Sequence, residues 1–289
     1  MTEGIVTSRG GVKVWEDYRN NIIVDKKNTI LRWKAEKDKY ASSLFPPEVQ
    51  ERFLHGIARI GSLHSEDALT WNVFRSLYQA NKLHLITDFL SPNMEASTLY
   101  FWGGHSLEKS SAEIDSTVQG ALNEIEPWGE DGRRQQTETD VMLRGRVDLV
   151  MVECKLGLPG KPVKAWIRSR SGMRDDYRKF IEKSSQRLFN DSFDFKSDGN
   201  RFCQLFRNYL LGAALSQRWR IQFWMLAIVN SKNTNLGGLP HETEFEYFRS
   251  KLVDPSNAVI ITWQQVMDAV KEESQLGKLR SYLENHTLL

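Results

Sequence analysis

The stretch TETDVMLRGRVDLVMVECKLG, residues 137–157, decides the expected fold. Its two apolar runs, separated by a glycine-containing turn signal, predict two short antiparallel β-strands. Both runs carry charge at one end: Asp140 lies near the start of the first, and Glu153 and Lys155 close the second. Because buried strands favour apolar residues, charged side chains at these positions indicate a place where chemistry could occur.

The register of this hairpin decides whether the two carboxylates meet. A four-residue loop at 144–147 would pair Asp140 with Met151, one diagonal step and roughly 5–8 Å from Glu153 on the same face. The alternative, a two-residue turn at Arg144-Gly145, would pair Asp140 with Leu149 and leave it about 13 Å along the strand from Glu153. Only the shorter separation allows both carboxylates to hold one cation, so we expect the longer loop or a bulge.

Two carboxylates and an ammonium at that spacing suit phosphodiester hydrolysis. Mg²⁺ binds one or two protein carboxylates together with water and phosphate oxygens, and Asp140 and Glu153 could be those carboxylates. The metal ion acidifies or orients the attacking water and neutralises the charge that develops. Lys155 can hold that water and a phosphate oxygen. The residues therefore predict a magnesium-dependent site on one face of the hairpin.

The pattern of Thr139-Asp140, twelve intervening residues and then Glu153-Cys154-Lys155 resembles the PD-(D/E)XK nuclease superfamily, which has the restriction-endonuclease-like fold. Thr139 replaces the proline of the superfamily's name, a common departure. The resemblance implies an α/β core with a mixed central β-sheet flanked by helices. It also implies that Mg²⁺, or Mn²⁺ in its place, is bound by the two carboxylates and the backbone carbonyl of Cys154, and that Lys155 is catalytic.

The resemblance further implies an acidic residue on a helix that precedes the hairpin. Residues from about 65 to 80 have the helical apolar period that this requires. Glu66 is our candidate as a catalytic and metal-binding acid, because it is in angular line with the apolar Val73 and Leu77. Asp67, which aligns with an aromatic row, is the alternative. The helix dipole also favours an acid in the first turn without any further function.

Strands and helices alternate along the rest of the chain, as in α/β domains. A loop-rich acidic stretch is expected at 108–138. Strands are expected at 97–104, 220–230 and 257–263, and helices at 26–44, 46–61, 65–80, 173–188, 201–216 and 264–275. We therefore expect a helical N-terminal segment at 1–64, packed on a nuclease-like α/β domain at 65–289.

Charge is unevenly distributed, although the formal net charge is only +2. Between Lys155 and Arg187, ten basic residues stand against three acidic ones. With Trp166, Tyr177 and Phe180 interleaved, this segment could form one wall of a DNA-binding groove. The alternative is a solvated helix face with ordinary core aromatics. The residues expected to contact DNA are Lys161, Lys164, Arg168, Arg170 and Arg174.

Composition indicates the cellular compartment in which this protein is expected to act. Two cysteines are too few for a disulfide framework and suit a reducing cytoplasm. The longest apolar run, 223–229, is far shorter than the ~20 residues of a membrane-spanning helix. The sequence favours a cytoplasmic, metal-dependent DNA endonuclease of restriction, defence or mobile-element type, which by analogy could act as a homodimer. The rival hypothesis is a nucleic-acid-binding or assembly subunit that retains the fold without turnover.

Overall fold

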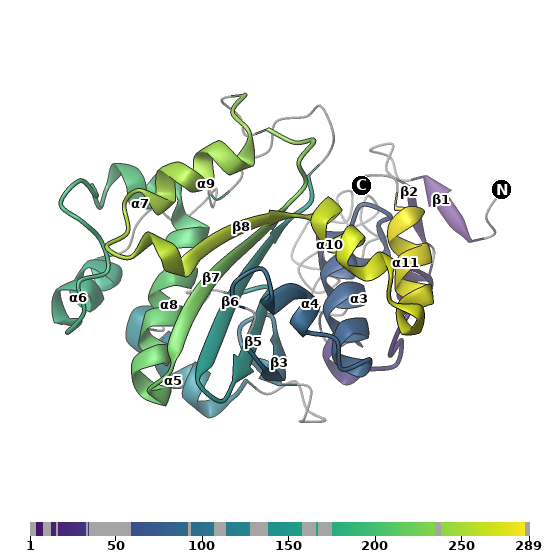
Figure 1. Cartoon of the computed structure of the whole chain (residues 1–289), viewed down its shortest axis with the longest axis horizontal. Coiled ribbons are helices and arrows are strands. Elements are labelled where there is room, and N and C mark those ends of the chain that lie inside the picture. The colour runs from purple at the N-terminus through teal and green to yellow at the C-terminus, as the bar shows by residue number, and fades with distance from the viewer. Residues whose placement is uncertain are drawn as a thin grey trace, which may run out of the picture.

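A six-stranded mixed sheet runs through the molecule (Figure 1). The computed structural model describes residues 4–7, 13–15, 17–32, 34, 59–91, 94–106, 114–127, 138–157, 166, 175–234 and 238–286. The strand order is β4-β3-β5-β6-β7-β8. The strands are β3 (Ala96–Phe101), β4 (His105–Ser106), β5 (Val141–Gly145), β6 (Asp148–Lys155), β7 (Gln222–Val229) and β8 (Ala258–Thr262).

The sheet is antiparallel on one side of β6 and parallel on the other. β3, β5 and β6 pair antiparallel, whereas β7 and β8 extend the sheet in parallel from β6. Parallel neighbours require crossover connections, and helices supply them here. This mixed sheet flanked by helices confirms the expected restriction-endonuclease-like architecture.

Helices cover both faces of the sheet (Figure 1). One face carries α3 (Glu66–Gln79), α4 (His84–Thr87), α10 (Trp263–Lys271) and α11 (Gly277–Glu284). The other face carries α5 (Ser116–Ile125), α6 (Asp175–Lys183), α8 (Cys203–Trp219) and α9 (His241–Arg249), with the short α7 (Ser197–Arg201) leading into α8. None of the described helices is both long and apolar enough to cross a bilayer.

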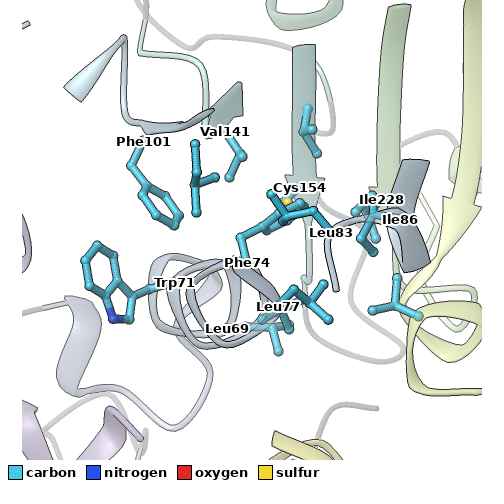
Figure 2. Close-up of a cluster of buried hydrophobic side chains, with 14 of the residues drawn as sticks. Leu69, Trp71, Phe74, Leu77, Leu83, Ile86, Phe101, Val141, Cys154 and Ile228 are labelled. Atoms are coloured by element: carbon cyan, nitrogen blue, oxygen red, sulfur yellow. The ribbon is translucent and has the colours of Figure 1, made fainter. Parts of the chain in front are cut away.

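Strand β6 is buried on both sides because its alternate residues enter two separate hydrophobic clusters. Val150, Val152 and Cys154 join the cluster under α3, and Figure 2 shows Cys154 among the apolar side chains of that layer. Leu149 and Met151 join the cluster under α8. The alternation confirms that Glu153, in line with Leu149 and Met151, faces the α8 layer.

Most of the expected elements are present with shifted ends. β3, β7 and β8 correspond to the expected strands, and α3, α8 and α10 to expected helices; α6 ends at Lys183, earlier than expected. The stretch 108–138, expected to be loop-rich, contains α5, whose N-cap Asp115 accepts the amides of Thr117 and Val118. Apolar residues at helical spacing form the buried side of this helix. The prediction of a loop was wrong because it rested on the acidic composition of the whole stretch and not on this spacing.

The described N-terminal residues include a feature that the sequence analysis did not expect. Strands β1 (Ile5–Thr7) and β2 (Lys13–Trp15) form a two-stranded antiparallel sheet, followed by the 3-10 turn η1 (Tyr18–Asn21). Residues 29–32 are helical, as expected, but residues 35–58 lie outside the described residues. A second 3-10 turn, η2 (Arg59–Gly61), precedes α3. The buried residues Ile22, Ile30, Leu31 and Ile60 belong to the same hydrophobic cluster as α3.

The predicted register of the β5–β6 hairpin is wrong by two positions. Val141 pairs with Val152, so Asp140 lies level with Glu153 and not with Met151. A shift of two residues leaves every side chain on its own face, so the apolar pattern fits either register equally well. The pattern therefore gave the correct face for Asp140 and could not give its position along the strand.

The position of the turn explains the register. Only residues 146 and 147 lie between the strands, and Val147 at the tip is 57% exposed. Gly145 remains in β5 because it passes close to the neighbouring strand: a Cβ there would lie 2.4 Å from the Glu95 carbonyl oxygen. The sequence suggested a turn at this glycine. In the structure the glycine is the last residue of β5, where it allows the close contact with the residue before β3, and the turn follows at residues 146 and 147.

Helix α8 lies close to β6 and β7 because a glycine faces them. A Cβ on Gly212 would lie 2.6 Å from the Phe223 ring and 2.9 Å from the Met151 side chain. Asn208 precedes Gly212 by four residues, about one helical turn, and so lies on the same side of α8. Because Met151 and Glu153 are neighbours on one face of β6, Asn208 is placed near the end of that strand.

Replacing Gly212 by alanine should destabilise the protein. Inside a helix this exchange ordinarily stabilises by about 1 kcal/mol, because glycine loses more backbone entropy on folding. At Gly212 the added methyl group overpacks the contact with β6 and β7, so we expect the free energy of unfolding to fall by about 1–3 kcal/mol. Chemical denaturation measures the change.

Gly120→Ala on α5 is the matched control. The nearest atom to its new methyl group would be in the flexible guanidinium of Arg218, at 3.3 Å, so this variant should be as stable as the parent or more stable. Equal gains in stability for both variants would contradict a tight α8–sheet contact.

Candidate functional site

Charged side chains gather where β6 ends. Lys155 Nζ lies 2.5 Å from Glu153 Oε1 and 3.5 Å from Glu66 Oε1, so the ammonium bridges the strand and helix α3. Glu153 is only 3% exposed. The structure thus brings the predicted lysine into contact with two of the three predicted acids.

Asp140 joins this group through the backbone of β6. Its Oδ2 accepts a hydrogen bond of 2.8 Å from the Cys154 amide, directly after Glu153. Its own carbonyl accepts from the amide of Trp102 at 3.1 Å, which fixes the chain just before β5. The carboxylates of Asp140 and Glu153 are close enough to repel each other. After burial, this repulsion is the next cause of the raised pKa of Asp140.

Helix α3 contributes Glu66 and not its neighbour. Ser65 caps the helix by accepting the amide of Ala68, so the helix begins at Glu66. Glu66 Oε2 accepts from the Leu156 amide at 2.7 Å, just beyond Lys155. Asp67 lies 3.9 Å from Lys34 instead. Of the two alternatives from the sequence, only Glu66 reaches the end of β6.

Burial and charge oppose each other in this cluster. Burial, followed by the negative charge of Glu153, raises the pKa of Asp140 well above its usual range. Burial also raises the pKa of Glu66, although about a third of its side chain is accessible. Burial would lower the pKa of Lys155, but the surrounding carboxylates outweigh it and raise that pKa well above normal. Lys155 is therefore a charged ammonium at neutral pH.

Helix α8 supplies two contacts that the sequence analysis did not identify. Asn208 Nδ2 donates to Glu153 Oε2 at 2.6 Å, and its Oδ1 accepts from Thr139 Oγ1 at 3.0 Å. The available signal was an asparagine one turn before a glycine, on a helix that is apolar on most sides. This spacing alone does not identify Asn208 as a site residue, because the sequence does not show which face of the helix meets the sheet.

The oxygen donors at the end of β6 suit a hard cation. The Asp140 carboxylate accepts from the Cys154 amide, and the Glu153 carboxylate and the Cys154 carbonyl both accept from Lys155 Nζ, the carbonyl at 3.0 Å. Within the described ranges, no three His, Cys, Asp or Glu side chains form a ready-made metal cage. Mg²⁺ commonly takes only one or two carboxylates and keeps several waters, so this donor set fits Mg²⁺ better than a cation that needs a full protein cage.

The residues expected to contact DNA lie outside the described residues: Lys161, Lys164, Arg168, Arg170 and Arg174. The aromatic residues interleaved with them are described, and Trp166, Tyr177 and Phe180 are buried in the cluster beneath α8. For these aromatics the alternative reading, ordinary core residues, is correct.

Comparison with known proteins gives one match. A family model described as "Restriction Endonuclease associating with ARP" matches residues 48–286, which include Glu66, the hairpin and Asn208. No curated protein and no solved structure matches the chain.

Asp140→Asn should stabilise the metal-free protein at neutral pH. Asparagine keeps an acceptor for the Cys154 amide and removes the charge. Because the pKa of Asp140 is raised by folding, the folded state binds more protons than the unfolded state, and stability falls as the pH rises from the usual aspartate range through the raised value. We expect the variant to melt above the parent beyond that window, by about 2–4 °C per kcal/mol.

Thermal denaturation in EDTA across a pH series measures this effect. The gain should disappear in acid, where both states of the parent are protonated. Asp191→Asn, at a side chain that is 96% exposed, removes the same formal charge and should show no such pH dependence. A parent that is more stable than Asp140→Asn at every pH would contradict the raised pKa of Asp140.

Proposed function

This chain belongs to the restriction endonuclease family whose model it matches, and we propose that it hydrolyses phosphodiester bonds of DNA in a reaction that depends on Mg²⁺. The observation that carries the proposal is the meeting of Asp140, Glu153 and Lys155 at the end of β6. A charged lysine held between two carboxylates suits a reaction in which both a metal ion and a phosphate must be held.

The two carboxylates of the hairpin would hold the metal ion. Asp140 and Glu153 come from adjacent strands, and their mutual repulsion is a cost that a divalent cation would relieve. When bound, the ion would acidify a water molecule and neutralise charge on the phosphate. Mn²⁺, which accepts the same oxygen donors, should substitute.

Lys155 would hold the attacking water and a phosphate oxygen. Its ammonium is anchored by Glu153 and Glu66 and by the Cys154 carbonyl, and its charge is maintained by the surrounding acids. Side-chain donors that are fixed before substrate arrives lower the barrier without reorganising during the reaction. Glu66 would orient Lys155 directly and contribute to the acidic site through water.

The family description favours duplex DNA as the substrate and internal cleavage as the reaction. We therefore propose an endonuclease of restriction, defence or mobile-element type that leaves a 5′-phosphate, as the resemblance of the motif implies. Two copies of the chain would serve to cut both strands. The rival, a subunit that binds nucleic acid without turnover, has to explain why the acids and the lysine are all retained in contact.

Incubation of supercoiled plasmid with the purified protein tests the proposal. We expect nicking or linearisation with Mg²⁺ or Mn²⁺ and none with EDTA. Asp140→Ala and Glu153→Ala should abolish cleavage because each removes a metal ligand. Lys155→Ala should lower the rate by about 10²–10³-fold, the usual effect of removing one preorganised donor to a reacting phosphoryl or acyl group.

Lys271→Ala at the exposed end of α10 is the control for loss of a lysine and should cleave like the parent. Cleavage that survives both EDTA and Asp140→Ala would exclude this mechanism. Gel shifts with duplex, single-stranded and branched DNA, without metal-dependent cleavage of any of them, would favour the non-catalytic rival.

A further inference from the structure

We propose that Asn208 is a positioning residue for the metal site, and that Thr139 fixes the direction in which its amide points. One buried side chain of α8 then ties together the two chain segments that carry the metal-binding carboxylates. This inference rests on the proposed function, since it concerns how Glu153 is presented to a cation.

Asn208 forms hydrogen bonds with both segments, the one that carries Glu153 and the one that carries Asp140. Asn208 Nδ2 donates to Glu153 Oε2 at 2.6 Å, and Asn208 Oδ1 accepts from Thr139 Oγ1 at 3.0 Å. Thr139 immediately precedes Asp140 in the chain. Exposure is 1% for Asn208, 0% for Thr139 and 3% for Glu153, so these bonds form in the interior, where no water competes for the donors.

The two ends of the Asn208 amide are not equivalent. An amide oxygen only accepts hydrogen bonds and an amide nitrogen only donates them, whereas a carboxylate only accepts. The Thr139 hydroxyl can donate to Oδ1, which turns Nδ2 toward Glu153. If that hydroxyl were missing, the amide could rotate and bring its oxygen against the Glu153 carboxylate. A threonine beside Asp140 therefore has a specific task in this chain.

Glu153 is held from both sides while keeping capacity for a cation. Oε1 accepts from Lys155 at 2.5 Å, and Oε2 accepts from Asn208. A carboxylate offers about four lone-pair sites, so two bonds fix its plane and leave further sites for a metal ion. Hydrogen bonds that orient a ligand in this way typically improve metal affinity or activity by about 10–100-fold.

The placement of Asn208 requires the close approach of α8 to the sheet. Gly212, four residues further along the helix, lets the helix backbone lie against Met151 and Phe223. Asparagine is a poor helix former, and burying its amide is costly without partners. Much of the helix around this position is apolar, with Leu205 and Leu211 fully buried or nearly so. Contact with Glu153 and Thr139 compensates for both costs.

Binding of Mn²⁺ to the full-length protein, measured by calorimetry or by electron paramagnetic resonance, tests the proposal without relying on cleavage. We expect Asn208→Ala to lower the affinity by about 10–100-fold and Thr139→Val to lower it in the same direction. Thr139→Ser, which keeps the hydroxyl, should bind Mn²⁺ within about twofold of the parent. Gln217→Ala, on the exposed side of α8, is the matched control and should bind like the parent.

Asn208→Asp tests the contact with Glu153 itself. Two carboxylates at this separation would share a proton, so Mn²⁺ binding should shift to higher pH relative to the parent. If Asn208 only stabilises the fold, Asn208→Ala and Thr139→Val would melt at lower temperature and yet keep the affinity of the parent.

The outcomes distinguish failure of this inference from failure of the proposed function. If the parent and Glu153→Ala show the same Mn²⁺ binding, the metal site itself is wrong. If the parent binds, Glu153→Ala does not, and folded Asn208→Ala and Thr139→Val both bind like the parent, the positioning role is overturned and the metal site stands. Should Asn208→Ala fail to fold, Thr139→Val decides alone, because it leaves Asn208 in place.

Discussion

The pairing of β5 with β6 is the constraint on which the rest of the site depends. Val141 opposite Val152 sets Asp140 level with Glu153, and only this register allows Asp140 to accept the Cys154 amide. A slip of one residue would turn Asp140 to the other face of the sheet, and a slip of two would move it about 7 Å along the strand. The hairpin therefore holds the two carboxylates level with each other, as the proposed shared cation would require.

The same hairpin has to tolerate charge in a buried place. Ionised groups in the interior are costly unless they are paired, and removing one partner leaves the other uncompensated. Here each charge has defined partners: Lys155 contacts Glu153 and Glu66, and backbone amides of β6 and the residue after it serve Asp140 and Glu66. The remaining excess of negative charge would suit the proposed cation, and functional sites that keep such an imbalance do so at the expense of stability.

Two helices complete the site from opposite faces of the sheet. α3 brings Glu66 to Lys155 from one side, and α8 brings Asn208 to Glu153 from the other. Both depend on tight packing: α3 on the apolar cluster around Cys154, and α8 on the absence of a side chain at Gly212. The end of β6 is therefore held by two helices that are far apart in the sequence, which is how a fold keeps a side chain in one geometry.

Local patterns were sufficient to predict the α/β class, the hairpin and the shared face of Asp140 and Glu153, because periods of 2 and 3.6 residues are local properties of strands and helices. The resemblance of the motif limited the helical acid to Glu66 or Asp67. Packing in three dimensions distinguished those two acids, set the hairpin register and brought Asn208 to the site. The register followed from the turn at residues 146 and 147, since Gly145 stays in β5 against the Glu95 carbonyl, and the position of Asn208 followed from Gly212 lying against β6. Both are contacts between distant segments, and no local pattern records which segments will meet.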